Sequence, residues 1–132
     1  MRTTILILAL STLAACGSDA VTAPSVDGTY TPRTLDGAAL PVTTTKLTGS
    51  AATITAGNLV LSGGSFTSQL TVQATVNGTV FTQVFPKSGT YTVAQNRLTF
   101  VERSDNSTST STLDGDTIVA TENGLVFTFK RQ

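Results

Sequence analysis

The sequence contains no histidine, no tryptophan and only one cysteine among its 132 residues. Without histidine the chain cannot form a Ser-His-Asp or Cys-His catalytic arrangement, and metal sites built on imidazole are excluded. A single cysteine permits no disulfide within the chain, so the fold depends on its hydrophobic core. We therefore expect a protein that is not an enzyme and that holds neither a metal ion nor a cofactor.

Charged residues are also scarce. They make up 12% of the chain, with eight basic and eight acidic side chains. No basic block is present that would attract phosphate groups, which argues against nucleic acid as a partner. The length suits one domain and is too short for two domains of ordinary size.

The acidic residues form no catalytic or metal-binding pattern. Asp114 and Asp116 flank Gly115, and we interpret this spacing as a turn because a calcium loop needs more oxygen ligands at defined positions. A glycosidase would need two carboxylates facing each other across a cleft, and the sequence around Glu102 and Glu122 does not indicate such a pair. The sequence thus predicts no catalytic residues.

The first fifteen residues have the three parts of a secretory signal peptide. Arg2 provides the basic start, residues 5–10 are an unbroken apolar run, and Ala15 is a small residue directly before Cys16. The apolar part is too short for a membrane helix, which needs about 20 apolar residues to cross the hydrocarbon. We therefore predict a signal peptide over residues 1–15, with cleavage between Ala15 and Cys16.

The end of this segment, Leu13-Ala14-Ala15-Cys16, resembles the lipobox of bacterial lipoproteins. The resemblance implies that Cys16 carries a diacylglyceryl group and an N-acyl chain such as palmitate, so that the membrane is a partner through this lipid anchor. One acyl chain alone binds a membrane only marginally, whereas several hold a protein stably on its surface. The alternative is an ordinary secretory signal beside an incidental cysteine.

The residues after the cysteine predict a location and a linker. Gly17, and not aspartate, follows the cysteine. In lipoproteins this implies the outer membrane if the host has two membranes, and otherwise the outer face of the cytoplasmic membrane. Residues 17–26 are small and polar and include Pro24, which is typical of a flexible linker. We assign residues 1–15 to the signal peptide, 16–27 to the lipidated cysteine and tether, and 28–132 to an antiparallel β domain.

From Gly28 onward, apolar and polar residues alternate with the period of two that is typical of half-buried strands. Threonine, which favours strands, occurs 27 times in the chain. Phe66, Leu70 and Val72 fall on one face of residues 66–76, while threonine and glutamine fall on the other. We predict no helix beyond the signal and strands near 28–35, 40–47, 51–55, 58–62, 65–76, 79–86, 88–94, 97–103, 107–113, 116–122 and 124–131.

Turn residues separate these strands. Asn77-Gly78, Asp114-Gly115, Asn123-Gly124 and Gly63-Gly64 suit hairpin turns, in which both central residues have positive φ. Consecutive strands are then neighbours in the sheet. We predict an all-β protein, an antiparallel up-and-down meander that closes into a small barrel, with a β-sandwich as the alternative.

The opening of the first strand resembles that of small bacterial lipocalin-like lipoproteins. Lipocalins begin with Gly-x-Trp, and here Gly28-Thr29-Tyr30 has tyrosine in place of tryptophan. The resemblance implies that a basic residue of the last strand, Arg131 or Lys130, packs against this ring. Envelope domains of the META type have a related opening. A lipocalin-like barrel implies a cup that binds a small apolar or amphiphilic ligand.

The aromatic residues are the group that would either line such a cavity or fill a solid core. They are Tyr30, Phe66, Phe81, Phe85, Tyr91, Phe100, Phe127 and Phe129. A barrel of about eight strands is compatible with both arrangements. Two functions follow: a membrane-anchored envelope lipoprotein that binds a small ligand, or a non-enzymatic structural or protein-interaction module of the cell envelope.

Overall fold

The computed structural model describes residues 25–132, and this part of the chain forms ten β-strands without a helix. The strands are β1 (Gly28–Leu35), β2 (Ala38–Ala39), β3 (Val42–Thr44), β4 (Ala52–Ser62), β5 (Ser65–Val76), β6 (Thr79–Ala94), β7 (Arg97–Glu102), β8 (Thr108–Asp114), β9 (Thr117–Glu122) and β10 (Leu125–Arg131). Within residues 25–132, no helix is long and apolar enough to cross a membrane. The predicted signal peptide and Cys16 lie outside the described residues.

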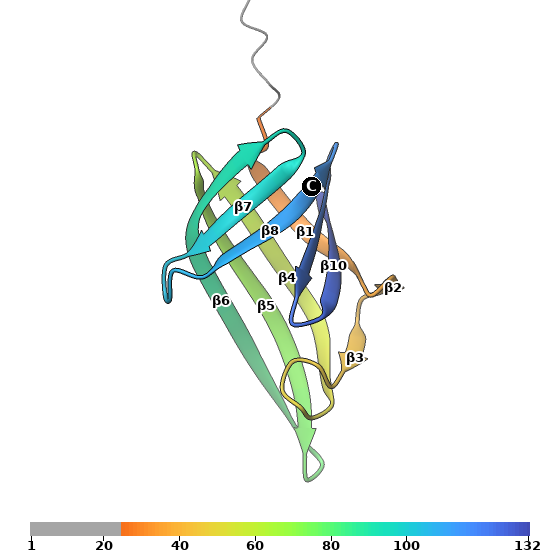
Figure 1. The fold of residues 1–132 in the computed structure, drawn as a ribbon. Helices are drawn as coiled ribbons and strands as arrows, with labels where there is room; N and C mark the ends of the chain where they lie inside the picture. Colours follow the sequence, from red (N-terminus) through yellow and green to blue (C-terminus); the bar gives the residue numbers. More distant parts are fainter. Residues whose placement is uncertain (1–24) are drawn as a thin grey trace, which may run out of the picture.

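Eight of the strands form a closed antiparallel barrel (Figure 1). From β4 to β10 each strand pairs with the next along the chain, and β1 closes the ring by pairing with β10 and with β4. The short strands β2 and β3 are additions beside β1 and β4. The prediction of an up-and-down meander that closes into a small lipocalin-like barrel is confirmed. The sandwich alternative is wrong, because the β1–β4 pairing closes one sheet on itself.

Two early strands differ from the prediction. The predicted segments 51–55 and 58–62 form the single strand β4, which continues past a bulge between Ile54 and Ala56. A bulge lets a strand bend without ending, so the small and polar residues at this point do not break it. The predicted strand 40–47 is shortened to the three residues of β3, and a loop follows it.

β6 also joins two predicted strands, 79–86 and 88–94, into one strand of 16 residues. Pro86 lies where β6 pairs with β5 but not yet with β7, and proline is tolerated on a strand with one free edge. Gly89 follows where the pairing with β7 begins. A Cβ atom at Gly89 would lie 1.9 Å from the carbonyl oxygen of Val101, so only glycine permits this approach of the two strands.

Three of the four predicted hairpin turns have positive φ at both residues, and Gly63 and Gly64 join β4 to β5 with φ values of 56° and 84°. Asn77 and Gly78 join β5 to β6 with φ values of 50° and 79°. Asn123 and Gly124 join β9 to β10 with φ values of 50° and 72°. Two consecutive positive φ angles match the twist of the flanking strands, and they explain why asparagine and glycine occupy these positions. The prediction for Asp114-Gly115 is wrong, because Asp114 still belongs to β8 and only Gly115 has positive φ.

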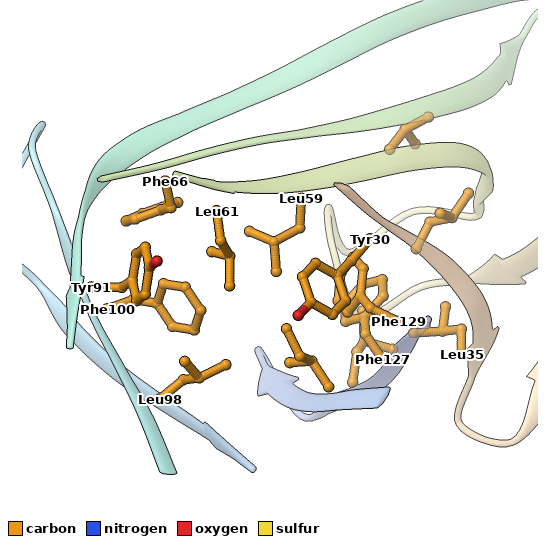
Figure 2. Packing of buried hydrophobic residues seen from close by; sticks show 14 of the residues in the cluster. Tyr30, Leu35, Leu59, Leu61, Phe66, Tyr91, Leu98, Phe100, Phe127 and Phe129 are labelled. Atoms are coloured by element: carbon orange, nitrogen blue, oxygen red, sulfur yellow. The ribbon is translucent and has the colours of Figure 1, made fainter. Parts of the chain in front are cut away.

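One end of the barrel is closed by packed side chains. Phe66 and Phe100 meet edge to face with their ring centroids 5.1 Å apart, and the Tyr91 ring lies 6.3 Å from Phe100. Figure 2 shows Leu61 between this aromatic group and Tyr30, which comes from the opposite wall. Aromatic pairs of this geometry contribute about 1 kcal/mol beyond the area that they bury.

Tyr30 links the first and last strands at this closed end. It is fully buried, and the guanidinium of Arg131 lies over its ring, 5.2 Å from the centroid. Arg131 also donates hydrogen bonds of 2.7 and 3.1 Å to the Tyr30 hydroxyl, which donates to the carbonyl of Val26 at 2.8 Å. A Cβ atom at Gly28 would lie 3.3 Å from Nε of Arg131, so glycine leaves room for the arginine. The expected basic partner of Tyr30 is therefore Arg131 and not Lys130.

Residues 25–27, the last part of the predicted tether, also contact the barrel. The carboxylate of Asp27 accepts hydrogen bonds from the Tyr91 hydroxyl and, at 3.1 Å, from the backbone N–H of Gly63. These two bonds hold the pKa of Asp27 below its usual value. The carbonyl of Ser25 accepts a hydrogen bond of 2.9 Å from Arg131. The chain is thus fastened to the barrel before β1 begins.

The β5–β6 hairpin extends well beyond the other strands at the opposite end of the barrel (Figure 1). Residues 71–86 of this hairpin include no charged side chain. At its base residues 71–73 still pair with β4, and the hairpin projects past β4 from Ala74 onward. We call residues 71–86 the arm. β6 pairs with β5 along the arm, but its pairing with β7 starts only at Gly89, so the arm has a free edge.

Candidate ligand-binding cavity

The barrel encloses a cavity of about 560 Å³. Its wall comes from β4 to β10, and its mouth is bordered by the loops that precede β4 and β8 and by the β9–β10 turn. The mouth is at the end of the barrel that carries the arm, and β1 begins at the other end (Figure 1). The cavity is therefore a cup that is closed by the aromatic core.

Small polar residues explain why this barrel is hollow. Ser109 and Ser111 on β8, with Ser107 just before it, line one wall of the cavity. Ser111 pairs with Leu98 on one neighbouring strand and with Ala120 on the other, so it lies deep in the barrel. A large apolar residue at these positions would fill the interior, whereas serine leaves space beside the ring-lined walls.

Five of the eight aromatic residues line the cavity: Phe66, Phe85, Phe100, Phe127 and Phe129. Phe127 and Phe129 follow each other on the inner face of β10, with ring centroids 5.9 Å apart. Leu59 and Leu70 add aliphatic surface. The cavity therefore has apolar walls that face a stripe of serines.

The other three aromatic residues do not line the cavity. Tyr30 and Tyr91 are buried in the core at the closed end, where both hydroxyls have hydrogen-bond partners. Phe81 belongs to neither the core nor the cavity, because it lies on the arm beyond the barrel and is 56% exposed. The alternation along β6 correctly places Phe81 on the same face as Phe85. It does not show that the β5–β6 hairpin is longer than the barrel, so that Phe81 lies outside it.

Three charged side chains meet at the mouth. Nζ of Lys87 on β6 donates a hydrogen bond to the carboxylate of Glu122 on β9 and lies 3.7 Å from the carboxylate of Glu102 on β7. Partial burial lowers the pKa of Lys87, but the hydrogen bond to Glu122 and the charges of both glutamates outweigh it, so the net shift is upward. Lys87 is therefore a charged ammonium that is already paired with two carboxylates.

A third carboxylate lies in the loop between β7 and β8. Asp105 lines the cavity, and its carboxylate accepts a hydrogen bond of 2.8 Å from the backbone N–H of Ser107. The hydrogen bonds from Ser107 hold the pKa of Asp105 below its usual value, and the charge of Lys87 acts in the same direction. Ser104 in the same loop donates a hydrogen bond of 2.8 Å to Glu102.

The loop between β3 and β4 covers part of the mouth. Nζ of Lys46 in this loop donates to the carboxylate of Asp36 and to the carbonyl of Gly124, both at 3.1 Å. The same carboxylate accepts the backbone N–H of Val126 at 2.8 Å. These bonds fix the loop across the β9–β10 turn, and they place the next residue, Leu47, against the cavity.

The charged group at the mouth was not predicted from the sequence. Glu102 and Glu122 give no sign of a pair there and Lys87 does not stand out, because the three residues are far apart along the chain. The alternation of inward and outward residues along the strands does indicate that Lys87 and Glu102 face the interior of the barrel. Lys87 follows Phe85 by two residues and Glu102 follows Phe100 by two, so each charge shares the inner face of its strand with a phenylalanine.

Residues 105–111 are all polar, and they include the start of the strand predicted near 107–113. The structure divides this segment between the loop before β8 and β8 itself. The serines of the segment face the cavity, so its polar character reflects the wall of a site and not only contact with bulk water.

No family model matches the sequence, and no curated protein is significantly similar to it. Among solved structures, an uncharacterized protein from Bacteroides eggerthii is similar to this chain, with 12% sequence identity and a TM-score of 0.47. The similarity covers 82% of this chain and 100% of the other. A likeness at this level carries no argument about function.

Proposed function

We propose that this protein is a membrane-anchored envelope lipoprotein whose lipocalin-like barrel binds a small amphiphilic ligand. The observation that carries the proposal is the cavity of about 560 Å³ inside the barrel. Ligand sites in proteins range from about 300 to 1,000 Å³ and combine apolar walls with a few polar groups. A barrel that served only as a structural element would gain stability from a filled interior.

The two sides of the cavity suit an amphiphile better than a purely apolar molecule. Each methylene group that a ligand buries against the phenylalanine walls contributes about 0.8 kcal/mol. The hydroxyls of Ser109 and Ser111 on β8 would remain without partners around a hydrocarbon, which costs free energy in a partly enclosed site. A ligand with an apolar body and a polar head satisfies both parts.

The position of the mouth supports binding on an anchored protein. β1 begins at the closed end of the barrel, where the carbonyl of Ser25 accepts a hydrogen bond from Arg131, and the mouth lies at the other end (Figure 1). With a lipid on Cys16, the mouth would stay free when the protein is attached to a membrane. This arrangement favours exchange of ligand with the surrounding compartment.

Native mass spectrometry tests ligand binding. The whole mature chain with Cys16→Ser would be exported in its own host and purified without detergent, because detergent itself would enter an apolar cavity. We expect a reproducible added mass of small-molecule size. Ser109→Phe should remove this mass by filling the cavity, while Thr110→Phe, on the outer face of the same strand, should keep it. A bare mass for the wild-type chain would contradict the proposal.

Fractionation tests the anchor separately. Cys16→Ala should move the protein from the membrane fraction to the soluble fraction and abolish incorporation of a fatty-acid label. The wild-type chain, processed in the same cells, is the control. A variant that stays in the membrane fraction would contradict the lipid anchor without affecting the argument for the cavity.

The arm favours a second candidate function, a protein-interaction module of the envelope. Val80 and Phe81 are 60% and 56% exposed, and Val76, Val84 and Phe85 are also exposed. Together with the free edge of β6, these side chains fit a partner that adds an extended strand to the arm. Exposed apolar groups of this kind mark interaction surfaces in many proteins.

Cross-linking in intact cells tests this second function. The wild-type chain should give a defined cross-linked product with an envelope protein, and the double variant Phe81→Thr/Val84→Thr should lose it. Val93→Thr removes an exposed apolar residue outside the arm and is the matched control. An unchanged pattern in the double variant would contradict a role for the arm.

A further inference from the structure

We propose that the cavity selects amphiphiles with a cationic head group, such as an alkylammonium, over those with an anionic one. This inference rests on the proposed ligand-binding function and adds the chemical class of the head group. The charged residues at the mouth carry it, together with a buried hydroxyl deeper in the cavity.

The charges that line the cavity are unequal. Lys87 is the one cation among the residues that form the described wall, and it stands against the three carboxylates of Glu102, Asp105 and Glu122. The mouth therefore has a surplus of negative charge in a partly enclosed space. Two unit charges interact more strongly in such a space than in bulk water, because the effective dielectric constant is lower.

The ion pairs of Lys87 further disfavour an anionic head group. The ammonium of Lys87 is already bound by Glu122 and lies 3.7 Å from Glu102. An anionic head group would have to compete with both glutamates for Lys87, and it would meet Asp105 as a further like charge. A cationic head group can share the carboxylates of Glu102 and Glu122 with Lys87, because each carboxylate accepts more than one hydrogen bond, and it meets Asp105 as an opposite charge.

A hydroxyl group deeper in the cavity provides an independent observation. Ser111 is only 6% exposed and lines the cavity. Its hydroxyl takes part in none of the side-chain hydrogen bonds found within residues 25–132. Thr31 Oγ1 is the only side-chain oxygen within residues 25–132 that is both fully buried and unpaired, so the hydroxyl of Ser111 is open to the cavity. There it can accept a hydrogen bond from an ammonium group.

The walls fit the body of the same ligand. The rings of Phe66, Phe100 and Phe127 lie along the cavity between its mouth and its closed end. Aromatic faces accept alkyl chains and also attract ammonium groups that have lost part of their water. An ammonium head group therefore finds favourable contacts with the carboxylates at the mouth and with the aromatic walls, whereas the surplus of carboxylates at the mouth repels an anionic head group.

Calorimetric titration of the mature chain with Cys16→Ser, at neutral pH and moderate salt, tests the inference with octylamine, octanol and octanoate. The three probes share one chain length and differ in head-group charge. We expect octylamine to bind at least about tenfold more tightly than octanoate, with octanol between them. The difference should shrink in high salt because salt screens the charges at the mouth.

In the double variant Glu102→Gln/Glu122→Gln, the ratio of the affinity for octylamine to that for octanoate should fall about tenfold or more. Its affinity for octanol should stay the same. Asp114→Asn removes one charge at the closed end of the barrel and is the matched control. Retained octanol binding shows that the double variant is folded and its cavity intact. Octanoate binding equal to or tighter than octylamine would overturn the selectivity and leave the proposed function standing. Failure of all three probes to bind would overturn both.

Discussion

Replacing Gly89 with alanine would place a methyl group where β6 and β7 approach most closely. The new Cβ would lie 1.9 Å from the carbonyl oxygen of Val101, whereas carbon and oxygen in contact across strands are about 3.3–3.6 Å apart, so the strands must separate by about 1.4 Å. This shift disturbs the pairing of Gly89 with Glu102, where each backbone hydrogen bond contributes about 1 kcal/mol. Overpacking strain adds about 1–3 kcal/mol. We expect the free energy of unfolding to fall by about 3 kcal/mol.

Urea and thermal unfolding followed by circular dichroism would measure this loss. Gly78→Ala is the matched control, because Gly78 has a φ of 79° and nothing within 4 Å of its added Cβ. Its cost is the backbone strain alone, about 1–2 kcal/mol. A loss for Gly89→Ala that does not exceed the loss for Gly78→Ala would refute the steric argument. Because Gly89 pairs with Glu102, the same variant should also weaken binding of octylamine.

Three further predictions concern stability. Arg131→Met should lower the free energy of unfolding by about 2 kcal/mol, since it removes charged hydrogen bonds and the cation–π contact with Tyr30, and chemical unfolding would measure the loss. Asp27→Asn should make stability less sensitive to acid, because the pKa of Asp27 is lowered in the folded state and its contribution is lost as the pH falls below the unfolded value of about 4. Melting curves should therefore show the wild type losing stability more steeply than the variant between about pH 4 and about pH 2. Phe81→Thr should change stability by less than about 0.5 kcal/mol because Phe81 lies on the exposed arm, whereas Phe100→Ala in the core should cost about 3–5 kcal/mol.

The strand pattern of the sequence predicts most of the fold because alternation and turn chemistry are local properties. Asn77-Gly78 and Asn123-Gly124 mark their hairpins through the positive φ that both residues adopt. The strand boundaries fail where tertiary context outweighs local preference. Pro86 and Gly89 suggest a break in β6, yet a free edge tolerates the proline and the close approach of β7 requires the glycine.

The site is harder to predict because its residues come together only when the barrel closes. Lys87, Glu102 and Glu122 lie on three strands, and their contacts follow from the order of the strands and from the depth of each residue in the barrel. Alternation gives the inner face of each strand but not this depth. The position of Phe81 was not predicted for the same reason. Phe81 lies on the same face of β6 as the cavity residue Phe85, but it is on the exposed arm beyond the mouth of the barrel.

The barrel divides its tasks between its two ends. The closed end contains Tyr30 and Tyr91, whose rings are buried and whose hydroxyls are paired, and it supplies much of the aromatic packing that stabilises the fold. The open end has serines and carboxylates inside, which reduce apolar burial and leave the space unfilled. Residues at the mouth, such as Glu122, can therefore be exchanged with less effect on folding than residues of the closed end. Ligand specificity can therefore change through substitutions at the mouth, while the packing of Tyr30 against Arg131 stabilises the closed end of the barrel.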